Sequence, residues 1–544
     1  MDKNRFYLKN VIAMAICLAG MIMFSSCDPE ENNSPAISVA DKSSLAQEVF
    51  ADNVQGKSDV NFTTTRAWTS SISTVPSPQM RAATNSSDWI SISPQSGNAG
   101  THTINIALKK NYTGTDRTAI ITILCNGEDI KITVTQMGIT KKGEIFVIDE
   151  NGVLTNYTGP GGNVAIPEEV KEIAEQVFVG NSTITSVNIP ASVITIGNYA
   201  FWNCTNLTTV SLVKNGRLQT IGDCAFKDTN ITSMDIPTSI VEIGSLAFEN
   251  CRKLLTVTFP ENCNLKSIGA GVFLYSGITS IIIPSSITEI GNSAFETCFK
   301  LSTVIFSKNS NLETISENAF RYSGINSIEI PASVTTIGQS AFYSSGLTAI
   351  VFAKGGSLKT IGAMAFQLSG SIRSIEIPTS VEEIGEYAFS GCGYLTTVTF
   401  AENSRLQTIG GGAFAYCSGI TSITIPASVT TLGSFAFGEC KNLTNFTFAK
   451  NSNLRKIDSH AFYLSGITSI EIPSSTTTIG DWAFMHCVDL KKITVHWTNP
   501  KTLTYGKEIF YGLTTNEITL YVPIGTAGLY KKNLVWSEFN IVEK

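Results

Sequence analysis

Apolar and polar residues alternate along the first part of the chain, from about residue 37 to residue 138. Short stretches such as "INIALKKN", "RTAIITILCNG" and "DIKITVTQMG" place an apolar residue at every second position, with Gly, Asn and Ser between the stretches. Alternation of this kind, with turn residues about every 8–12 positions, is typical of a small antiparallel β-sandwich. We expect Trp68 and Trp89 to lie in its core.

From residue 145 onward the apolar residues follow a longer period. A phenylalanine, usually preceded by Ala, returns after 22 or 23 and then after 24 or 25 residues, and a proline marks every second repeat. The phenylalanines are Phe201, Phe226, Phe248, Phe273, Phe295, Phe320, Phe342, Phe366, Phe389, Phe414, Phe437, Phe462 and Phe484, and the prolines are Pro190, Pro237, Pro284, Pro331, Pro378, Pro426 and Pro473. A fixed period in the twenties predicts a leucine-rich solenoid, in which each repeat supplies one short strand and one return path.

The segment "ITSIEIPSSTTTIGDWAF" shows how one repeat is expected to fold. Alternation in a strand points Ile470 and Ile472 into the core and Glu471 outward, and the proline that follows ends the strand. Gly480 is expected to permit a turn that a side chain would obstruct, and Phe484 to fill the interior. Each repeat exposes an apolar edge until the next one covers it, so the repeat is stable only when copied.

The first 27 residues have the pattern of a signal peptide. Lys3, Arg5 and Lys9 precede an uncharged run over 11–24, which is long enough for a signal-peptide core and too short to span a membrane. The following "SSC" resembles a bacterial lipoprotein signal, and this resemblance implies lipidation at Cys27. The alternative is an ordinary cleaved signal peptide with an incidental cysteine.

The residues after Cys27, "DPEENNSPA", are acidic and have no apolar period, which is typical of a flexible tether. The acidic stretch resembles the surface-export signal of some gut bacteria. The resemblance implies an exported protein that is lipid-anchored in the outer membrane and exposed at the cell surface. Whether it faces outward or into the periplasm stays open.

The repeats resemble the BspA-like leucine-rich repeat family of surface proteins, whose marker is "IPxSVxxIGxxAFxxC". The resemblance covers residues 145–544 and implies a solenoid with a parallel, concave β-sheet. It also implies a role in adhesion to host matrix proteins and to other bacteria. The ending "TLYVPIGTAGLYKKNLVWSEFNIVEK" resembles the family's C-terminal cap, in which Trp536 and Phe539 would cover the last open face.

The alternating region resembles the BACON domain, an immunoglobulin-like module of Bacteroidetes proteins. The resemblance rests on "AWT", "DWISISPQSG", "RTAIITI" and the closing "ITVTQ". It implies either a carbohydrate site or a spacer. A sugar site needs exposed aromatic faces, whereas a sandwich core needs buried ones, so the position of Trp68 and Trp89 decides between the two.

We therefore expect an N-terminal β-sandwich followed by a leucine-rich repeat solenoid. The predicted domains are a lipoprotein signal peptide (1–27), a flexible tether (28–36), a BACON-like β-sandwich (37–138), an N-terminal solenoid cap (139–180), leucine-rich repeats (181–494) and a C-terminal cap (495–544).

Composition narrows the function classes. The formal net charge is -6 and only 15% of residues are charged, so the chain lacks the excess of Lys and Arg that nucleic-acid binding needs. The mean hydropathy is +0.13, yet no window after residue 27 holds the roughly 18 consecutive apolar residues of a spanning helix. Contact with a membrane is therefore expected through the lipid anchor alone.

Seven of the twelve cysteines fall three residues after a repeat phenylalanine. They are Cys204, Cys251, Cys298, Cys392, Cys417, Cys440 and Cys487. Neighbouring strands lie about 4.8 Å apart, so cysteines two repeats apart would be about 10 Å apart, beyond the roughly 7 Å limit for a disulfide. Only Cys417 has such cysteines in both adjacent repeats. We expect buried free thiols that act as small apolar fillers.

The sequence offers little that would support catalysis. The histidines, His102, His460, His486 and His496, form no zinc-binding spacing with cysteine, and there is no nucleophile elbow or phosphate loop. We predict a protein that is not an enzyme and has no catalytic residues, no metal site and no cofactor.

Function in a solenoid usually lies on its extended sheet, and the repeat period identifies the residues that point outward. The candidate binding face consists of Ser186, Asn188, Ser233, Asp235, Ser280, Ser327, Glu329, Ser374, Glu376, Ser422, Thr424, Ser469 and Glu471. It is rich in Ser and Thr, has an acidic stripe, and suits a long polymer. We expect an adhesin that binds a host or bacterial surface protein, mucin, glycoprotein or polysaccharide; the alternative is a glycan-capture lipoprotein whose sugar site lies on the BACON-like domain.

Overall fold

The computed structural model describes residues 35–50, 53–75, 88–111, 116–138 and 145–544. The predicted signal peptide, Cys27 and all but the end of the tether lie outside these residues. The chain divides into two compact units, a β-sandwich and a solenoid.

The sandwich has two antiparallel sheets that share one apolar core. The first sheet has the order β1 (Ile37–Val39), β3 (Val60–Thr64), β7 (Gly100–Leu108) and β5 (Ile90–Ser93), and the second has the order β2 (Ala46–Val49), β9 (Glu128–Gln136), β8 (Arg117–Cys125), β4 (Trp68–Val75) and β6 (Ser96–Gly97), with a 3-10 turn at Lys42–Leu45. In β3 and β8 alternate residues are buried, as the period-two pattern predicts. The expected sandwich is confirmed.

Each turn of the solenoid contributes a longer strand to one side of the solenoid. These strands are β12 (Gly162–Ala165), β14 (Ile184–Ile189), β16 (Thr209–Leu212), β18 (Ser233–Asp235), β20 (Thr256–Thr258), β22 (Ser280–Ile283), β24 (Thr303–Phe306), β26 (Ser327–Ile330), β28 (Ala349–Phe352), β30 (Ser374–Ile377), β32 (Thr397–Phe400), β34 (Ser422–Ile425), β36 (Asn445–Phe448), β38 (Ser469–Ile472), β40 (Lys492–Val495), β42 (Thr519–Val522) and β43 (Asn540–Glu543). We call their outward side the long-strand face.

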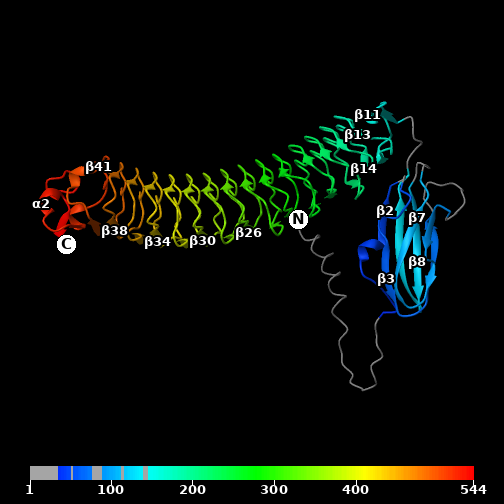
Figure 1. Ribbon diagram of the computed structural model, residues 1–544, viewed down its shortest axis with the longest axis horizontal. Helices are drawn as coiled ribbons and strands as arrows, with labels where there is room; N and C mark the ends of the chain where they lie inside the picture. Colours follow the sequence, from blue (N-terminus) through cyan, green and yellow to red (C-terminus); the bar gives the residue numbers. More distant parts are fainter. Residues whose placement is uncertain (1–34, 51–52, 76–87, 112–115, 139–144) are drawn as a thin grey trace, which may run out of the picture. The chain divides into compact units, whose positions relative to one another are not determined.

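A second, two-residue strand lies on the return path of each turn, where the sequence predicts only a return segment. These short strands are β13 (Glu172–Ile173), β15 (Thr195–Ile196), β17 (Thr220–Ile221), β19 (Glu242–Ile243), β21 (Ser267–Ile268), β23 (Glu289–Ile290), β25 (Thr314–Ile315), β27 (Thr336–Ile337), β29 (Thr360–Ile361), β31 (Glu383–Ile384), β33 (Thr408–Ile409), β35 (Thr431–Leu432), β37 (Lys456–Ile457), β39 (Thr478–Ile479) and β41 (Thr504–Tyr505). Neighbouring strands of both sets pair in parallel, with breaks in the pairing after β16, β28 and β32 in the long set and after β19 in the short set. Figure 1 shows β26, β30, β34 and β38 along one edge of the solenoid and β41 on the other.

The repeat phenylalanines form a continuous stack through the interior. Phe320, for example, packs against Phe295 and Phe342 with ring centroids 5.1 and 5.2 Å away and with nearly parallel planes. The branched residues of each long strand, such as Ile470 and Ile472, are buried beside the stack. The expected roles of the apolar residues in the repeat are therefore confirmed.

Gly480 is needed for a different reason from the predicted turn. Its backbone is not in the left-handed region, but a Cβ atom there would lie only 2.5 Å from the backbone nitrogen of Ser459 in the preceding turn. The glycine therefore permits close approach of two backbones.

Both ends of the solenoid are covered. At the start, β10 (Phe146–Ile148) and β11 (Val153–Tyr157) form an antiparallel pair that leads into the short strands. At the other end, the segment after β41 carries the 3-10 turn Thr515–Glu517 and helix α2 (Ala527–Tyr530), and a further 3-10 turn, Pro500–Thr502, precedes β41. Trp536 and Phe539 pack on Phe510, the last ring of the stack, at 5.2 and 4.9 Å between ring centroids.

Candidate binding face

The predicted face residues lie side by side on the long strands. Parallel pairing sets Ser374 beside Thr397 and Glu376 beside Thr399, and the same register aligns Ser422 with Asn445. All the predicted residues from β18 to β38 are exposed, and Asn188 is half-buried. The structure therefore gathers them on one surface.

Ser186 is the exception to the predicted exposure. Only 3% of its surface is accessible, and its hydroxyl donates a hydrogen bond of 2.5 Å to Oδ1 of Asn163 on β12. The prediction that Ser186 belongs to the exposed face is wrong, because the period gives the direction of a side chain but not what the neighbouring turn places over it.

The four acidic residues of the face differ in their surroundings. Asp235 accepts a hydrogen bond of 2.5 Å from Thr258, and Glu471 lies 2.8 Å from Nε2 of His496. Sequence reasoning did not bring His496 to Glu471, because the histidine lies past the last proline repeat, where the period weakens.

Open grooves cross the long-strand face, and two of them lie next to each other over β26–β36. The larger has a volume of about 1060 Å³, and its lining includes Glu329, Val351, Glu376, Ser380 and Arg405. A second groove of about 670 Å³ follows it over β32–β36. Their walls include the loops after every second long strand, such as the loop around Gly355, and the alternating spacing of the phenylalanines was the signal for these longer loops.

The sandwich places its tryptophans in the core. Trp68 is 1% exposed and packs edge-on against Phe62, and Trp89 is 8% exposed with the Arg117 guanidinium 4.5 Å from its ring centroid. Burial lowers the pKa of Arg117 to about 10. Neither indole offers an open face to a sugar.

The repeat cysteines are buried free thiols, as expected, but they do more than fill space. The Sγ atom of each donates a hydrogen bond to the carbonyl oxygen of the phenylalanine in the preceding turn, at 3.1 Å for Cys251 and Phe226. Burial raises the pKa of Cys251 to about 12. A thiol in this state is a poor nucleophile.

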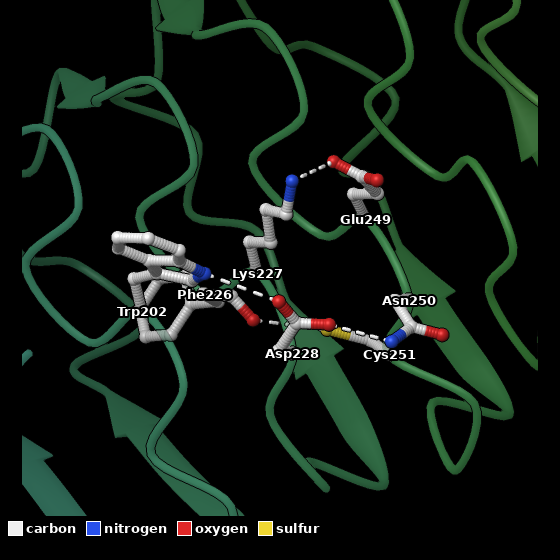
Figure 2. Close-up of polar contacts among 7 residues, drawn as sticks. All are labelled: Trp202, Phe226, Lys227, Asp228, Glu249, Asn250 and Cys251. Carbon is white, nitrogen blue, oxygen red and sulfur yellow. Dashed lines mark hydrogen bonds and ion pairs between the residues drawn. The ribbon is translucent and has the colours of Figure 1, made fainter. Parts of the chain in front are cut away.

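Polar side chains also link consecutive turns next to the cysteine position. Figure 2 shows that Asp228 accepts hydrogen bonds from Trp202 in the preceding turn, at 3.1 Å, and from Asn250 in the following turn, at 2.5 Å. Lys227 pairs with Glu249 at 2.7 Å, and this hydrogen bond is the main cause of the raised pKa of the lysine. These contacts hold neighbouring turns together and leave little open for a ligand.

Other chemical sites are not evident in the described part of the chain. Residues 35–50, 53–75, 88–111, 116–138 and 145–544 contain no cluster of three or more potential metal ligands. Among the same residues, no helix is long and apolar enough to cross a membrane. His460 stacks on Trp482 and His486 contacts Tyr511, which are packing roles.

The fold defines a parallel-stranded solenoid that follows a small β-sandwich in the chain. The sequence model of the BspA type leucine rich repeat region matches the solenoid over residues 160–254, 219–348, 313–431, 359–491 and 407–530. The chain therefore belongs to the BspA-type leucine-rich repeat family. The model of the BACON domain, described as a putative binding domain, matches residues 81–137, so the chain also carries a BACON domain.

Solved structures show similar solenoids. A leucine-rich repeat protein from Bacteroides ovatus is 23% identical with a TM-score of 0.51, and the match covers 69% of this chain and 97% of that protein. A leucine-rich repeat protein from Eubacterium ventriosum is 23% identical with a TM-score of 0.40, covering 63% and 92%. At this identity the first likeness shows a shared fold and nothing about a ligand. No curated protein matches the chain.

Proposed function

We propose that the protein is a cell-surface adhesin that holds a host matrix protein, mucin or another extended polymer on its long-strand face. The observation that carries this proposal is the long row of exposed side chains across β18–β38, mostly Ser, Thr and acidic with Ile282, Ile305 and Val351 among them, and with grooves along it. A long, regular surface fits a long ligand better than a small molecule. Leucine-rich repeat and BACON domains are typically non-enzymatic binding modules, which agrees with this reading.

The proposal includes a location, which is the outer membrane, where a lipid anchor would hold the protein. Lipidation at Cys27 would hold the chain on the outer membrane without a spanning helix, since acyl chains contribute about 0.8 kcal/mol per buried CH₂. The tether over 28–36 would separate the binding domains from the lipid surface. Labelling with palmitate, and its loss in Cys27→Ala, tests the anchor.

Glycan capture by the sandwich is disfavoured by the burial of Trp68 and Trp89. Since carbohydrate stacking needs an accessible ring face, these two residues cannot provide it in this structure. The sandwich then serves as a spacer between tether and solenoid.

An array of matrix proteins, mucins and polysaccharides, probed with residues 28–544, tests the proposed function. Ser374→Arg with Ser422→Arg should abolish capture because it places bulky charges on the long-strand face. Gln219→Arg with Gln407→Arg adds the same charge at exposed positions next to the short strands and should leave capture intact. An equal loss of ligand capture in both double variants would refute the proposal that the long-strand face binds the ligand. Release of products from any glycan would refute the prediction that the protein is not an enzyme.

A further inference from the structure

Two carboxylates in the lining of the larger groove, those of Glu329 and Glu376, are available to bind a cationic group. Asp235 and Glu471 each have a polar partner on the face, as described above. Glu329 and Glu376 are exposed, and neither has a hydrogen bond or ion pair within the described residues. The groove therefore offers two unpaired negative charges.

The spacing of these carboxylates favours one backbone conformation in a ligand. Glu329 on β26 pairs in register with Val351 on β28, and Glu376 lies on β30, the next strand. β28 and β30 belong to separate sheets, but the repeat rings of the same three turns, Phe342, Phe366 and Phe389, are 5.3 Å apart from one turn to the next. The two carboxylates therefore project about 10 Å apart along the solenoid. In a polyproline II segment, side chains three residues apart share one side and lie about 9 Å apart. In a β-strand the same-side distance is only about 7 Å.

The surface between the carboxylates is apolar. Val351 is 56% exposed, and Phe352 and Pro378 are half-buried in the groove lining. Proline-rich segments in this conformation dock in apolar, aromatic-lined grooves. The apolar surface of Val351, Phe352 and Pro378 therefore suits the proline rings of such a segment.

A buried hydroxyl in the groove lacks an acceptor. The equivalent serines of two other turns, Ser333 and Ser475, donate hydrogen bonds of 2.9 Å to the carbonyl oxygens of Ser310 and Ser452. The Oγ atom of Ser380 is buried and has no partner among the described residues, and the same is true of the equivalent Ser192 and Ser428 in two other turns. A polyproline II segment has no internal hydrogen bonds, so its carbonyl oxygens are free to accept one from Ser380.

We propose that this groove binds a polyproline II segment of a partner protein that carries Lys or Arg at every third position. The basic side chains pair with Glu329 and Glu376, the residues between them cover Val351 and Phe352, and a backbone carbonyl accepts from Ser380. Lys354 and Arg405 lie on the loops that line the groove. Their positive charges repel the basic side chains of the segment, so these side chains point toward the strands. The inference rests on the proposed function and specifies its partner.

A capped fluorescent peptide of repeated Lys-Pro-Pro units, titrated against residues 28–544, tests the proposal by anisotropy. Glu329→Lys with Glu376→Lys should weaken binding by about 10-fold or more. Glu242→Lys with Glu383→Lys makes the same charge change on the short strands β19 and β31 and should leave binding unchanged. Ser380→Ala should weaken binding roughly 3-fold.

Two further peptides test the spacing and the charge. A Lys-Pro repeat with the same number of lysines should bind several-fold more weakly, since its basic groups do not recur at every third position. A Glu-Pro-Pro repeat should not bind. Equal weakening by both double variants, equal binding of the two lysine peptides, preference for the acidic peptide, or no binding at about 1 mM peptide would each overturn the proposal.

The failure of this inference differs from that of the adhesin proposal. If the array ligand is captured and lost with the Ser374→Arg pair while the Lys-Pro-Pro peptide does not bind, the long-strand face stands and the groove assignment falls. If the peptide binds as expected but no array ligand depends on the face, the adhesin proposal falls.

Discussion

The thiol of Cys440 donates a hydrogen bond of 3.0 Å to the carbonyl oxygen of Phe414, one turn earlier in the solenoid. The same relationship joins Cys487 to Phe462 and Cys392 to Phe366. In the seven turns with a cysteine at this position, the thiol therefore ties the turn to the preceding one by a buried polar contact, next to the stacked rings.

The first prediction concerns the reactivity of this thiol. Burial raises the pKa of Cys440 to about 12, so very little reactive thiolate exists near neutral pH. Iodoacetamide at about pH 8 should leave Cys440 unmodified in the folded chain and modify it fully in urea. Peptide mapping by mass spectrometry measures both states, and similar rates in both would contradict the buried thiol.

The second prediction follows from the same pKa. The ordinary value is 9.0, so between about pH 9 and about pH 12 the folded chain keeps a proton that the unfolded chain has lost. The contribution of the Cys440 thiol to the free energy of unfolding is therefore complete below about pH 9 and is lost as the pH rises toward 12. Each such thiol should lower the free energy of unfolding by about 1.4 kcal/mol per pH unit in this window.

Urea unfolding of wild type and Cys440→Ser at several alkaline pH values isolates this effect. Serine keeps a donor for Phe414 and does not titrate in this window, so the variant should lose stability less steeply. Tyrosines and lysines titrate in both proteins and cancel in the comparison. Identical slopes would show that Cys440 does not hold its proton in the folded state.

The third prediction concerns the phenylalanine stack. Phe320→Ala removes a fully buried ring with neighbours on both sides and should cost about 3–5 kcal/mol. Phe299→Ala is the control, because that ring is 69% exposed and should change stability by less than about 0.5 kcal/mol. The midpoint of urea unfolding of the solenoid measures both, and hydrogen exchange should rise in the turns around Phe320. A similar small effect in both variants would contradict the role of the stack.

Much of the solenoid could be predicted from the sequence because each buried position recurs at a fixed spacing. Ile470, Ile472 and Phe484 repeat in every copy as the same kind of residue, and burial requires that sameness. The long strands and the outward residues follow directly. The prediction for Ser186 was wrong because this side chain is buried by contacts such as the one with Asn163. These contacts occur in one turn only and therefore leave no repeating pattern in the sequence.

The backbone around each phenylalanine could not be predicted. Residues two before and two after it adopt left-handed conformations in turn after turn, among them Trp482 and His486 with φ of 54° and 57°. Glycine occupies these positions in only some turns, such as Gly271 and Gly412, so it does not mark them in the sequence. In the turn of Phe484 the conformation is fixed by three hydrogen bonds to the next turn, from the backbone nitrogens of Trp482, Phe484 and His486. The grooves could not be predicted either, because their walls are loops. The repeat period gives the register of the strands but not how far these loops project from the surface.

The last prediction tests the close approach of neighbouring turns at glycine. Gly480→Ala would place Cβ 2.5 Å from the backbone nitrogen of Ser459 and 2.7 Å from the carbonyl carbon of Asp458, and these backbone atoms cannot rotate away. We expect destabilisation of about 1–3 kcal/mol and faster hydrogen exchange across the two turns. Gly528→Ala is the matched control, because no atom lies within 4 Å of its added Cβ and alanine favours the short helix α2. If the two substitutions shift the unfolding midpoint equally, steric contact between turns is not what requires glycine in the repeat.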